Sequence, residues 1–232
     1  MSGGLCVESL SAWYTSAQPV LEDVSFTLDT HEIVGLIGCN GAGKTTLFNV
    51  LSGLHAGFGA RSVCWNGEPV QFRDVTFKQV RYSVFSEDSA FGYFSFREYL
   101  RFVSRIYKRS LSDVEMLVEG FRFKEYVEVP IRDLSTGNRK KVFLITALAL
   151  RPPLLFLDEP VNGLDFQSTE FFYQCLRAYR ATGTVLFSSH VLESVTLTAD
   201  RVLVLESGRI GRTFSKETLD GQTIREVLND DG

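Results

Sequence analysis

Residues 38–45 place glycines, a lysine and a hydroxyl at a spacing that suits the binding of phosphate. The stretch matches the pattern G-x-x-x-x-G-K-[ST] at every position. Glycines let the backbone curl until several N–H groups point at one anion, and a following helix adds its positive end. A chance glycine turn before a helix is the alternative, and the full match disfavours it. The predicted phosphate site is made of Gly38, Asn40, Gly41, Ala42, Gly43, Lys44, Thr45 and Thr46.

Two acids follow the apolar run of residues 154–157. A buried strand delivers its carboxyl end to the ligand crevice of an open α/β sheet, so Asp158 and Glu159 are expected beside the phosphates. Asp158 and Thr45 would hold Mg²⁺, and Glu159 would polarise an attacking water molecule. Taken alone, the acids fit a strand that runs into a polar loop equally well. Beside the glycine-rich loop, hydrolysis of a nucleoside triphosphate with Glu159 and Lys44 as catalytic groups is favoured.

Strands and helices alternate around these motifs, as in a largely parallel sheet that is covered on both faces. A short apolar strand at 32–38 precedes the glycine-rich loop, and a helix at 44–54 follows it. Asn66 and Gly67 predict a turn between two strands within 61–70. The remaining expected elements are strands at 21–28, 154–158 and 184–188, helices at 136–150, 166–180 and 216–228, and a hairpin at 201–212.

The middle of the chain differs in kind from this alternating pattern. Residues 87–133 are rich in helical periodicity and aromatics and lack a clear buried strand. We therefore expect a single domain over residues 1–232 of the α/β class. It would comprise a P-loop NTPase core with a mostly parallel sheet, an N-terminal antiparallel β part, and a helical lobe inserted at 87–133.

Composition narrows the range of partners. The chain of 232 residues is 44% hydrophobic and carries a net charge of -4, without a long basic run, which argues against a nucleic-acid binder. The 4 cysteines form no Cys-x-x-Cys pair, and they fit reduced thiols in a cytosolic protein. The first ten residues do not resemble a secretory signal. No apolar stretch approaches the roughly 20 residues that span a bilayer, so any membrane role is expected to depend on a partner.

Residues 134–138 read Leu-Ser-Thr-Gly-Asn and resemble the signature motif of the ABC ATPase family, which is usually Leu-Ser-Gly-Gly-Gln. Other P-loop enzymes lack this motif, and the resemblance covers nearly the whole chain. In the family, two subunits close head to tail around ATP. The resemblance therefore implies that Ser135 and Gly137 face the γ-phosphate of ATP held by an opposite subunit. A plain helix N-cap is the alternative for Ser135.

Three further positions resemble functional residues of the family. Asp165 ends a segment, residues 162–165, that resembles the loop lying across the dimer seam. His190 follows a predicted strand and resembles the histidine that contacts the γ-phosphate and helps to fix the catalytic glutamate. Tyr14 stands where the family places an aromatic ring against adenine, although an aromatic here could equally belong to the core.

Some positions depart from the family pattern. Ser86 stands where a glutamine usually contacts Mg²⁺ and links the site to the membrane partner, and Glu87 follows it. Thr136 and Asn138 replace the usual Gly and Gln of the signature, and His31 replaces a usual glycine. Aromatic residues crowd into the stretch 85–102, where the family receives a short helix from the membrane subunit. These rings could instead fill the core of the lobe.

The resemblance implies an ATPase subunit of an ABC transporter, most like those of bacterial drug, peptide or lipid exporters. Its expected ligands are ATP and Mg²⁺. The expected partners are a second ABC ATPase subunit, in a homodimer or heterodimer, and a transmembrane permease, with no nucleic acid. Such a subunit would be cytoplasmic and peripheral on the inner face of the cell membrane. An ABC ATPase acting on a soluble macromolecular complex is the alternative, and a GTPase is disfavoured because no Asn-Lys-x-Asp motif is present.

Overall fold

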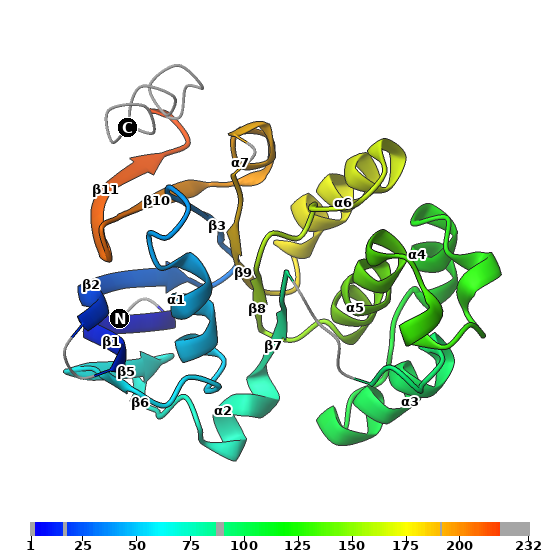
Figure 1. The fold of residues 1–232 in the computed structure, drawn as a ribbon, viewed down its shortest axis with the longest axis horizontal. Coiled ribbons are helices and arrows are strands. Elements are labelled where there is room, and N and C mark those ends of the chain that lie inside the picture. The colour runs from blue at the N-terminus through cyan, green and yellow to red at the C-terminus, as the bar shows by residue number, and fades with distance from the viewer. Residues whose placement is uncertain (1–2, 16–17, 87–90, 191, 219–232) are drawn as a thin grey trace.

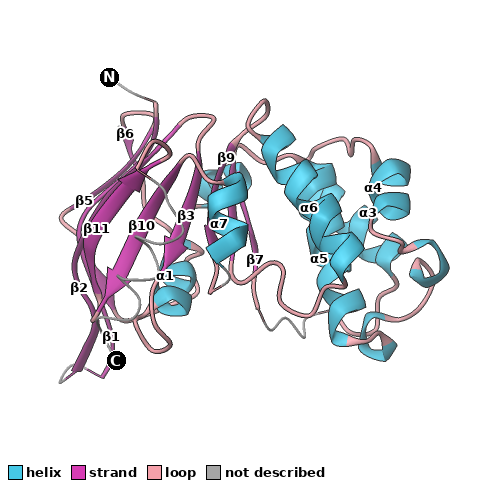
Figure 2. Cartoon of the chain, turned by 90° about the horizontal axis from the view of Figure 1, so that it is seen from above, coloured by secondary structure: helices cyan, strands magenta, loops and turns pink. Residues whose placement is uncertain are grey.

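The computed structural model describes residues 3–15, 18–86, 91–190 and 192–218. Two β-sheets lie at one end of the molecule and most of the helices lie at the other (Figure 1). Figure 2 shows the same division from above, with α3, α4, α5 and α6 grouped apart from the strands. Among the described residues, no helix combines the length and the apolar character needed to cross a bilayer.

The N-terminal sheet is antiparallel, as expected, with strand order β2-β1-β5-β6 and β4 paired to β1. Asn66 and Gly67 both take positive φ angles, 52° and 82°, in the predicted turn between β5 and β6. Such a turn matches the twist of the strands that it joins. The strands of this sheet are β1 (Gly4–Thr15), β2 (Gln18–Asp29), β4 (Phe58–Gly59), β5 (Ser62–Trp65) and β6 (Glu68–Pro69).

The second sheet has the strand order β11-β10-β3-β9-β8-β7 and is parallel except for β11. Because β3, β8 and β9 are neighbours in this order, the loops that follow them meet at one edge of the sheet. The expected motifs at 38–45, 158–159 and 190 therefore come together. The strands are β3 (Ile33–Ile37), β7 (Arg81–Val84), β8 (Leu154–Leu157), β9 (Thr184–Ser188), β10 (Arg201–Glu206) and β11 (Arg209–Ser215).

Both faces of this parallel sheet are buried. Along β8, Leu154 and Phe156 join a core shared with α1 and the N-terminal sheet, whereas Leu155 and Leu157 face the core of the helical lobe. Parallel sheets require such two-sided burial. The helices are α1 (Lys44–Leu51), α2 (Val75–Val80), α3 (Phe96–Tyr107), α4 (Val114–Gly120), α5 (Thr136–Leu150), α6 (Phe166–Tyr179) and α7 (Leu192–Thr198), with 3-10 turns η1 (Lys124–Tyr126) and η2 (Ile131–Asp133).

The helical lobe is present between β7 and β8. Residues 91–133 hold α3, α4 and the two 3-10 turns, and their only described β pairing is a single bridge between Ser95 and Pro130. The predicted boundary at residue 87 lies outside the described residues, as does most of the helix predicted at 216–228. Helix α5, which packs on α3 and α4, is buried on nearly all sides and joins the lobe to the sheet.

Candidate active site

The glycine-rich loop connects β3 to α1, the strand–loop–helix context that its sequence requires. Gly43 has a φ of 106°, and a Cβ atom on it would lie 2.7 Å from Leu21 Cδ2. A Cβ atom on Gly38 would lie 2.2 Å from the carbonyl oxygen of Leu205. Only glycine fits these positions, so the close packing of the loop against β2 and β10 fixes its curled shape.

Lys44 is buried at the start of α1, and its ammonium group contacts the backbone of the glycine-rich loop. Its Nζ donates to the carbonyl oxygens of Gly38 and Cys39, at 2.6 and 3.2 Å. The loop and both acids of the β8 end line one pocket of about 250 Å³. A buried cation, a helix N-terminus and a glycine cradle in one pocket suit a polyphosphate anion. The lining residues are Val20, Asn40, Gly41, Gly43, Lys44, Thr45, Thr46, Asp158 and Glu159.

Asp158 is fully buried and accepts hydrogen bonds from three hydroxyl groups. Its Oδ2 atom accepts from Thr45 Oγ1 at 3.0 Å and from Ser86 Oγ at 3.4 Å, and its Oδ1 atom accepts from Ser188 Oγ at 2.7 Å. Mg²⁺ prefers oxygen ligands and is commonly bound by one or two protein groups together with water and substrate phosphates. The Thr45 hydroxyl beside the Asp158 carboxylate fits such an ion.

Glu159 is held in a left-handed backbone conformation, with φ 48°. Its N–H donates to Ser188 Oγ at 2.8 Å. Its carboxylate Oε2 lies 2.8 Å from Nδ1 of His190 and also accepts from the His190 N–H at 3.4 Å. The Glu159 carboxylate and the His190 ring are therefore in contact, and Glu159 also lines the phosphate pocket.

Ser188 is a site residue that sequence reasoning missed. As the last residue of β9, it donates to Asp158 and accepts from the N–H of Glu159, so one hydroxyl orients both acids. The available signal was a polar residue ending a buried strand just before a candidate catalytic histidine.

Tyr14 presents most of its ring to solvent. Its side chain is 67% exposed, its hydroxyl lies 3.4 Å from Thr46 Oγ1, and its ring meets the His55 ring edge-on at 4.8 Å. The alternative that this ring fills the core is wrong. An exposed aromatic beside the start of α1 is placed to stack on a base whose phosphates lie in the loop. Contact with adenine stays a prediction.

Ser135 and Gly137 do not line the phosphate pocket of their own chain. Ser135 is exposed and caps α5, with its Oγ accepting from the Asn138 N–H at 3.3 Å. A Cβ atom on Gly137 would lie 2.3 Å from the carbonyl oxygen of Gly163. The turn before α6 therefore packs directly on the first turn of α5. This packing within one chain explains why residue 137 is a glycine.

The Asp165 carboxylate is engaged by groups of its own chain. It caps α6 by accepting from the Ser168 N–H at 2.9 Å, and it accepts from Lys141 Nζ at 2.7 Å. The Lys141 ammonium holds the pKa of this carboxyl well below its usual range, and the Ser168 hydrogen bonds add to the effect. In this structure Asp165 joins α5 to α6, and the expected nucleotide contact stays a prediction.

Two departures from the family pattern have structural explanations. Ser86 lies two residues after the end of β7 and donates to Asp158, so a hydroxyl stands beside this carboxylate where the family usually has a glutamine. His31 has a φ of 63°, a conformation that favours glycine, and its Nδ1 lies 2.8 Å from the carbonyl oxygen of Arg180. Glu87, the acid that follows Ser86, lies outside the described residues.

Comparison with known proteins agrees with this geometry. Residues 21–162 match the family model described as "ABC transporter". The chain is 39% identical over 218 residues to the ABC transporter ATP-binding protein AlbC of Bacillus subtilis (strain 168), covering 90% of this chain and 91% of AlbC. It is 35% identical over 196 residues to a Nod factor export ATP-binding protein I of Rhizobium johnstonii, covering 82% of this chain and 62% of that protein.

A solved structure titled "Structure of ATP binding subunit of ABC transporter" has a TM-score of 0.82 and 28% identity, and the match covers 99% of this chain and 95% of that one. The match extends over both sheets and the helical lobe, and confirms the predicted fold class. With its phosphate loop, paired acids and signature helix, this chain belongs to the ABC transporter ATP-binding family.

Proposed function

We propose that this chain hydrolyses MgATP as one of two paired subunits and drives export through a separate membrane subunit. The observation that carries the proposal is the 2.8 Å contact of His190 with Glu159, which lines the same pocket as Lys44. A binding module without turnover would need the loop and its lysine but no oriented general base.

Each residue of the site has a role in this reaction. The loop N–H groups and Lys44 bind the triphosphate. When bound by Thr45 and Asp158, Mg²⁺ supplies positive charge that neutralises the phosphate oxygens. Glu159 orients the attacking water and accepts its proton, while His190 keeps the Glu159 carboxylate aimed at the pocket. Ser188 keeps both acids in place.

The exposed signature segment supports a two-subunit assembly. Ser135 and Gly137 sit at the N-terminus of α5, where backbone N–H groups and the helix dipole favour an anion. Because these residues do not line the pocket of their own chain, a second subunit placed head to tail would supply the triphosphate that they contact. The second subunit is either another copy of this chain or a related ATPase.

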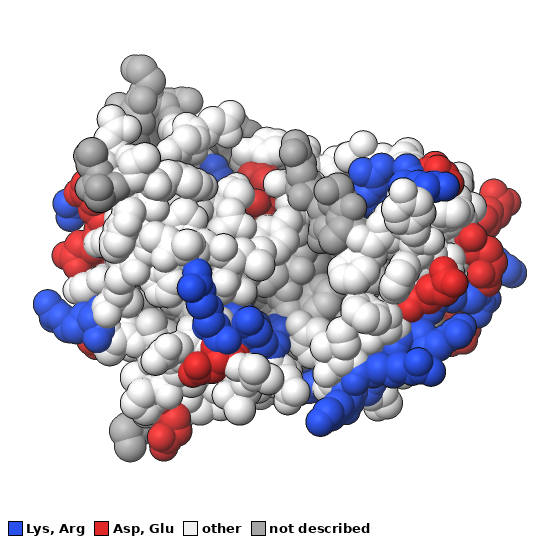
Figure 3. Space-filling view, turned by 60° about the horizontal axis from the view of Figure 1, so that its bottom comes forward, with Lys and Arg blue, Asp and Glu red and all other residues white. Residues whose placement is uncertain are grey.

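A groove of about 480 Å³ between α2 and α3 supports a membrane partner. Leu54, Val75 and Ile106 line it and are exposed, and Phe85, the residue before Ser86, also lines it. An apolar groove of this kind suits the apolar face of a short helix. Figure 3 shows Lys and Arg side chains gathered along the lower right of the molecule, and α3 contributes the exposed Arg101 and Arg105.

The crowded aromatics divide between core and surface. Phe96 and Tyr99 are buried in the lobe, whereas Tyr93 is exposed and Phe91 is partly so. The names of several relatives, Nod factor export ATP-binding proteins, support export as the direction. We propose that the subunit acts on the cytoplasmic face of the cell membrane.

Steady-state phosphate release by the purified chain tests the chemistry. Glu159→Gln is expected to lower turnover by roughly 100-fold or more while ATP binding is retained, and to accumulate an ATP-bound dimer in size-exclusion chromatography. Turnover of Glu159→Gln at the wild-type rate would contradict the assignment of the base. Co-purification of the tagged chain with a soluble complex, and with no integral membrane protein, would contradict the transport role.

A further inference from the structure

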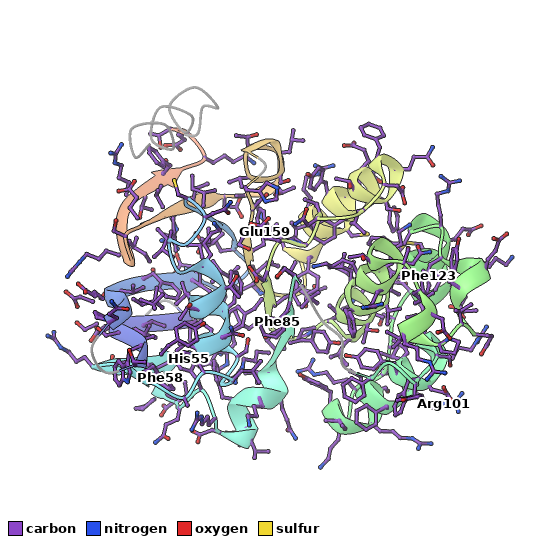
Figure 4. All side chains as sticks on the ribbon, viewed as in Figure 1. His55, Phe58, Phe85, Arg101, Phe123 and Glu159 are labelled. Atoms are coloured by element: carbon purple, nitrogen blue, oxygen red, sulfur yellow. The ribbon has the colours of Figure 1, made fainter. Side chains whose placement is uncertain are left out.

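Lys140 connects the signature helix to the two loops that carry the acids of the site. It lies in α5, five residues after Ser135, and it is 3% exposed. Its Nζ donates to the carbonyl oxygen of Phe85 at 2.9 Å and to that of Glu159 at 3.4 Å. Figure 4 labels both acceptor residues, which lie between the strands and the helical lobe. They follow the adjacent parallel strands β7 and β8.

The Glu159 contact bears on catalysis because the Glu159 backbone is strained. A left-handed conformation is unfavourable for an L-residue, and it persists only where surrounding groups hold it. Ser188 holds the peptide on the N–H side of Glu159, and Lys140 holds the carbonyl on the other side. This conformation directs the carboxylate to His190.

The Phe85 contact reaches the other acid. Phe85 immediately precedes Ser86, whose hydroxyl donates to Asp158. The Lys140 ammonium therefore binds two loops. One carries Phe85 and Ser86, next to the proposed Mg²⁺-binding carboxylate, and the other carries Glu159, the proposed general base. The bond to the Phe85 carbonyl, at 2.9 Å, is charge-assisted and lies in a dry environment, where such bonds are strong, whereas the contact with the Glu159 carbonyl, at 3.4 Å, is longer and weaker.

We propose that Lys140 is a positioning residue for hydrolysis, which holds the Glu159 peptide in the conformation that aims its carboxylate at the attacking water. Because Lys140 belongs to the helix that Ser135 caps, a shift of α5 relative to the sheet would move Glu159. The proposal rests on the proposed ATPase function.

A purely structural role is the competing explanation. In that case Lys140 would satisfy two buried carbonyls and stabilise the junction of lobe and sheet, without influence on the carboxylate. The two explanations differ in what a substitution changes: the free energy of unfolding alone, or the turnover of correctly folded, ATP-bound protein.

The kinetic test compares Lys140→Met and Lys140→Arg with Thr146→Val. Thr146 is a matched control because it is buried in the same helix and donates only within it, to the Val142 carbonyl at 2.7 Å. Misplacement of a catalytic group by about 1 Å can cost roughly 100-fold in rate. Lys140→Met is therefore expected to lower kcat by roughly 10- to 100-fold with KM for MgATP within about twofold. Lys140→Arg, which keeps the donors, is expected to recover most of kcat.

A second readout does not depend on turnover. The chain has only 3 histidines, so the imidazole resonances of His190 can be assigned with a His190→Ala variant. Release of the Glu159 peptide by Lys140→Met is expected to shift the His190 resonances, and Thr146→Val is expected to leave them in place.

The outcomes separate the two proposals. If the wild-type chain releases no phosphate, the proposed function fails, while the His190 resonances still test the Lys140–Glu159 link. Unchanged His190 resonances in folded Lys140→Met would overturn the inference, and so would a kcat within twofold of wild type. A fall in kcat that Thr146→Val reproduces would also overturn it.

Discussion

Gly137 in the first turn of α5 and Gly163 in the turn before α6 are packed backbone to backbone, so that a Cβ atom on Gly137 would lie 2.3 Å from the Gly163 carbonyl oxygen. Gly137 is the one glycine of this chain's signature segment. Its contact with Gly163 requires a glycine at this position for packing within one chain, independently of any contact with a partner's nucleotide. The same turn leads into Asp165, whose carboxylate is bound by Lys141 of α5. Helix α5 and the loop at residues 162–165 thus form one unit.

Gly137→Ala is expected to destabilise the folded chain, because backbone on both sides of the contact must separate. Overpacking of this kind typically costs about 1–3 kcal/mol. Urea unfolding of the purified chain measures the effect. Gly59→Ala is the control, since a Cβ atom there would meet only Trp13 Cη2, at 3.9 Å. Equal unfolding midpoints for the two variants would show that the contact is relaxed in solution.

Asp165→Asn is expected to reduce stability at neutral pH by about 1–2 kcal/mol, because buried Lys141 loses its carboxylate partner. The pKa of Asp165 is lowered in the folded state, so its carboxylate contributes stability above the unfolded pKa of about 3.9. That contribution is lost as pH falls through the folded value. Urea midpoints recorded from pH 6 to pH 2 should fall less steeply for Asp165→Asn than for wild type; parallel curves would contradict the assignment.

Ser188→Ala is expected to impair both metal binding and turnover. The change removes a donor from Asp158 Oδ1 and the acceptor of the Glu159 N–H. A loss of roughly 10- to 100-fold in kcat is expected from misplacement of the base, together with a higher Mg²⁺ requirement. Phosphate release measured across Mg²⁺ concentrations at saturating ATP checks both effects. If only the Mg²⁺ dependence changes, Ser188 does not position Glu159.

Leu54→Asp is expected to weaken attachment to the membrane partner without affecting ATP hydrolysis by the purified chain. Leu54 lines the groove between α2 and α3 and is exposed, so a charge there costs the isolated chain little and disfavours an apolar helix. Leu197→Asp introduces the same charge at an exposed leucine of α7. Retention of each variant on washed membranes is the measurement, and equal retention of the two would exclude the groove as the docking surface.

Features set by local chain geometry were predictable from the sequence. The strand–glycine loop–helix unit, the strand that ends before Asp158 and the turn at Asn66 and Gly67 all appear as expected. Strand β1 was not predicted, because irregularities in its pairing with β2 interrupt the alternation of buried and exposed residues. Helices α2 and α7 are too short for a helical period to be recognised.

The sequence alone thus determined the phosphate loop, the acids after a buried strand and the family signature, because each depends on residues that are neighbours in the chain. Only the tertiary structure decided how these pieces are held. Ser188 meets Asp158 across 30 positions, and Lys140 meets Phe85 across 55. Such contacts depend on which strands are adjacent and on how a helix lies against a sheet edge. Long-range packing fixes the order of the strands and the position of the helix, and neither can be inferred from the spacing of residues along the chain.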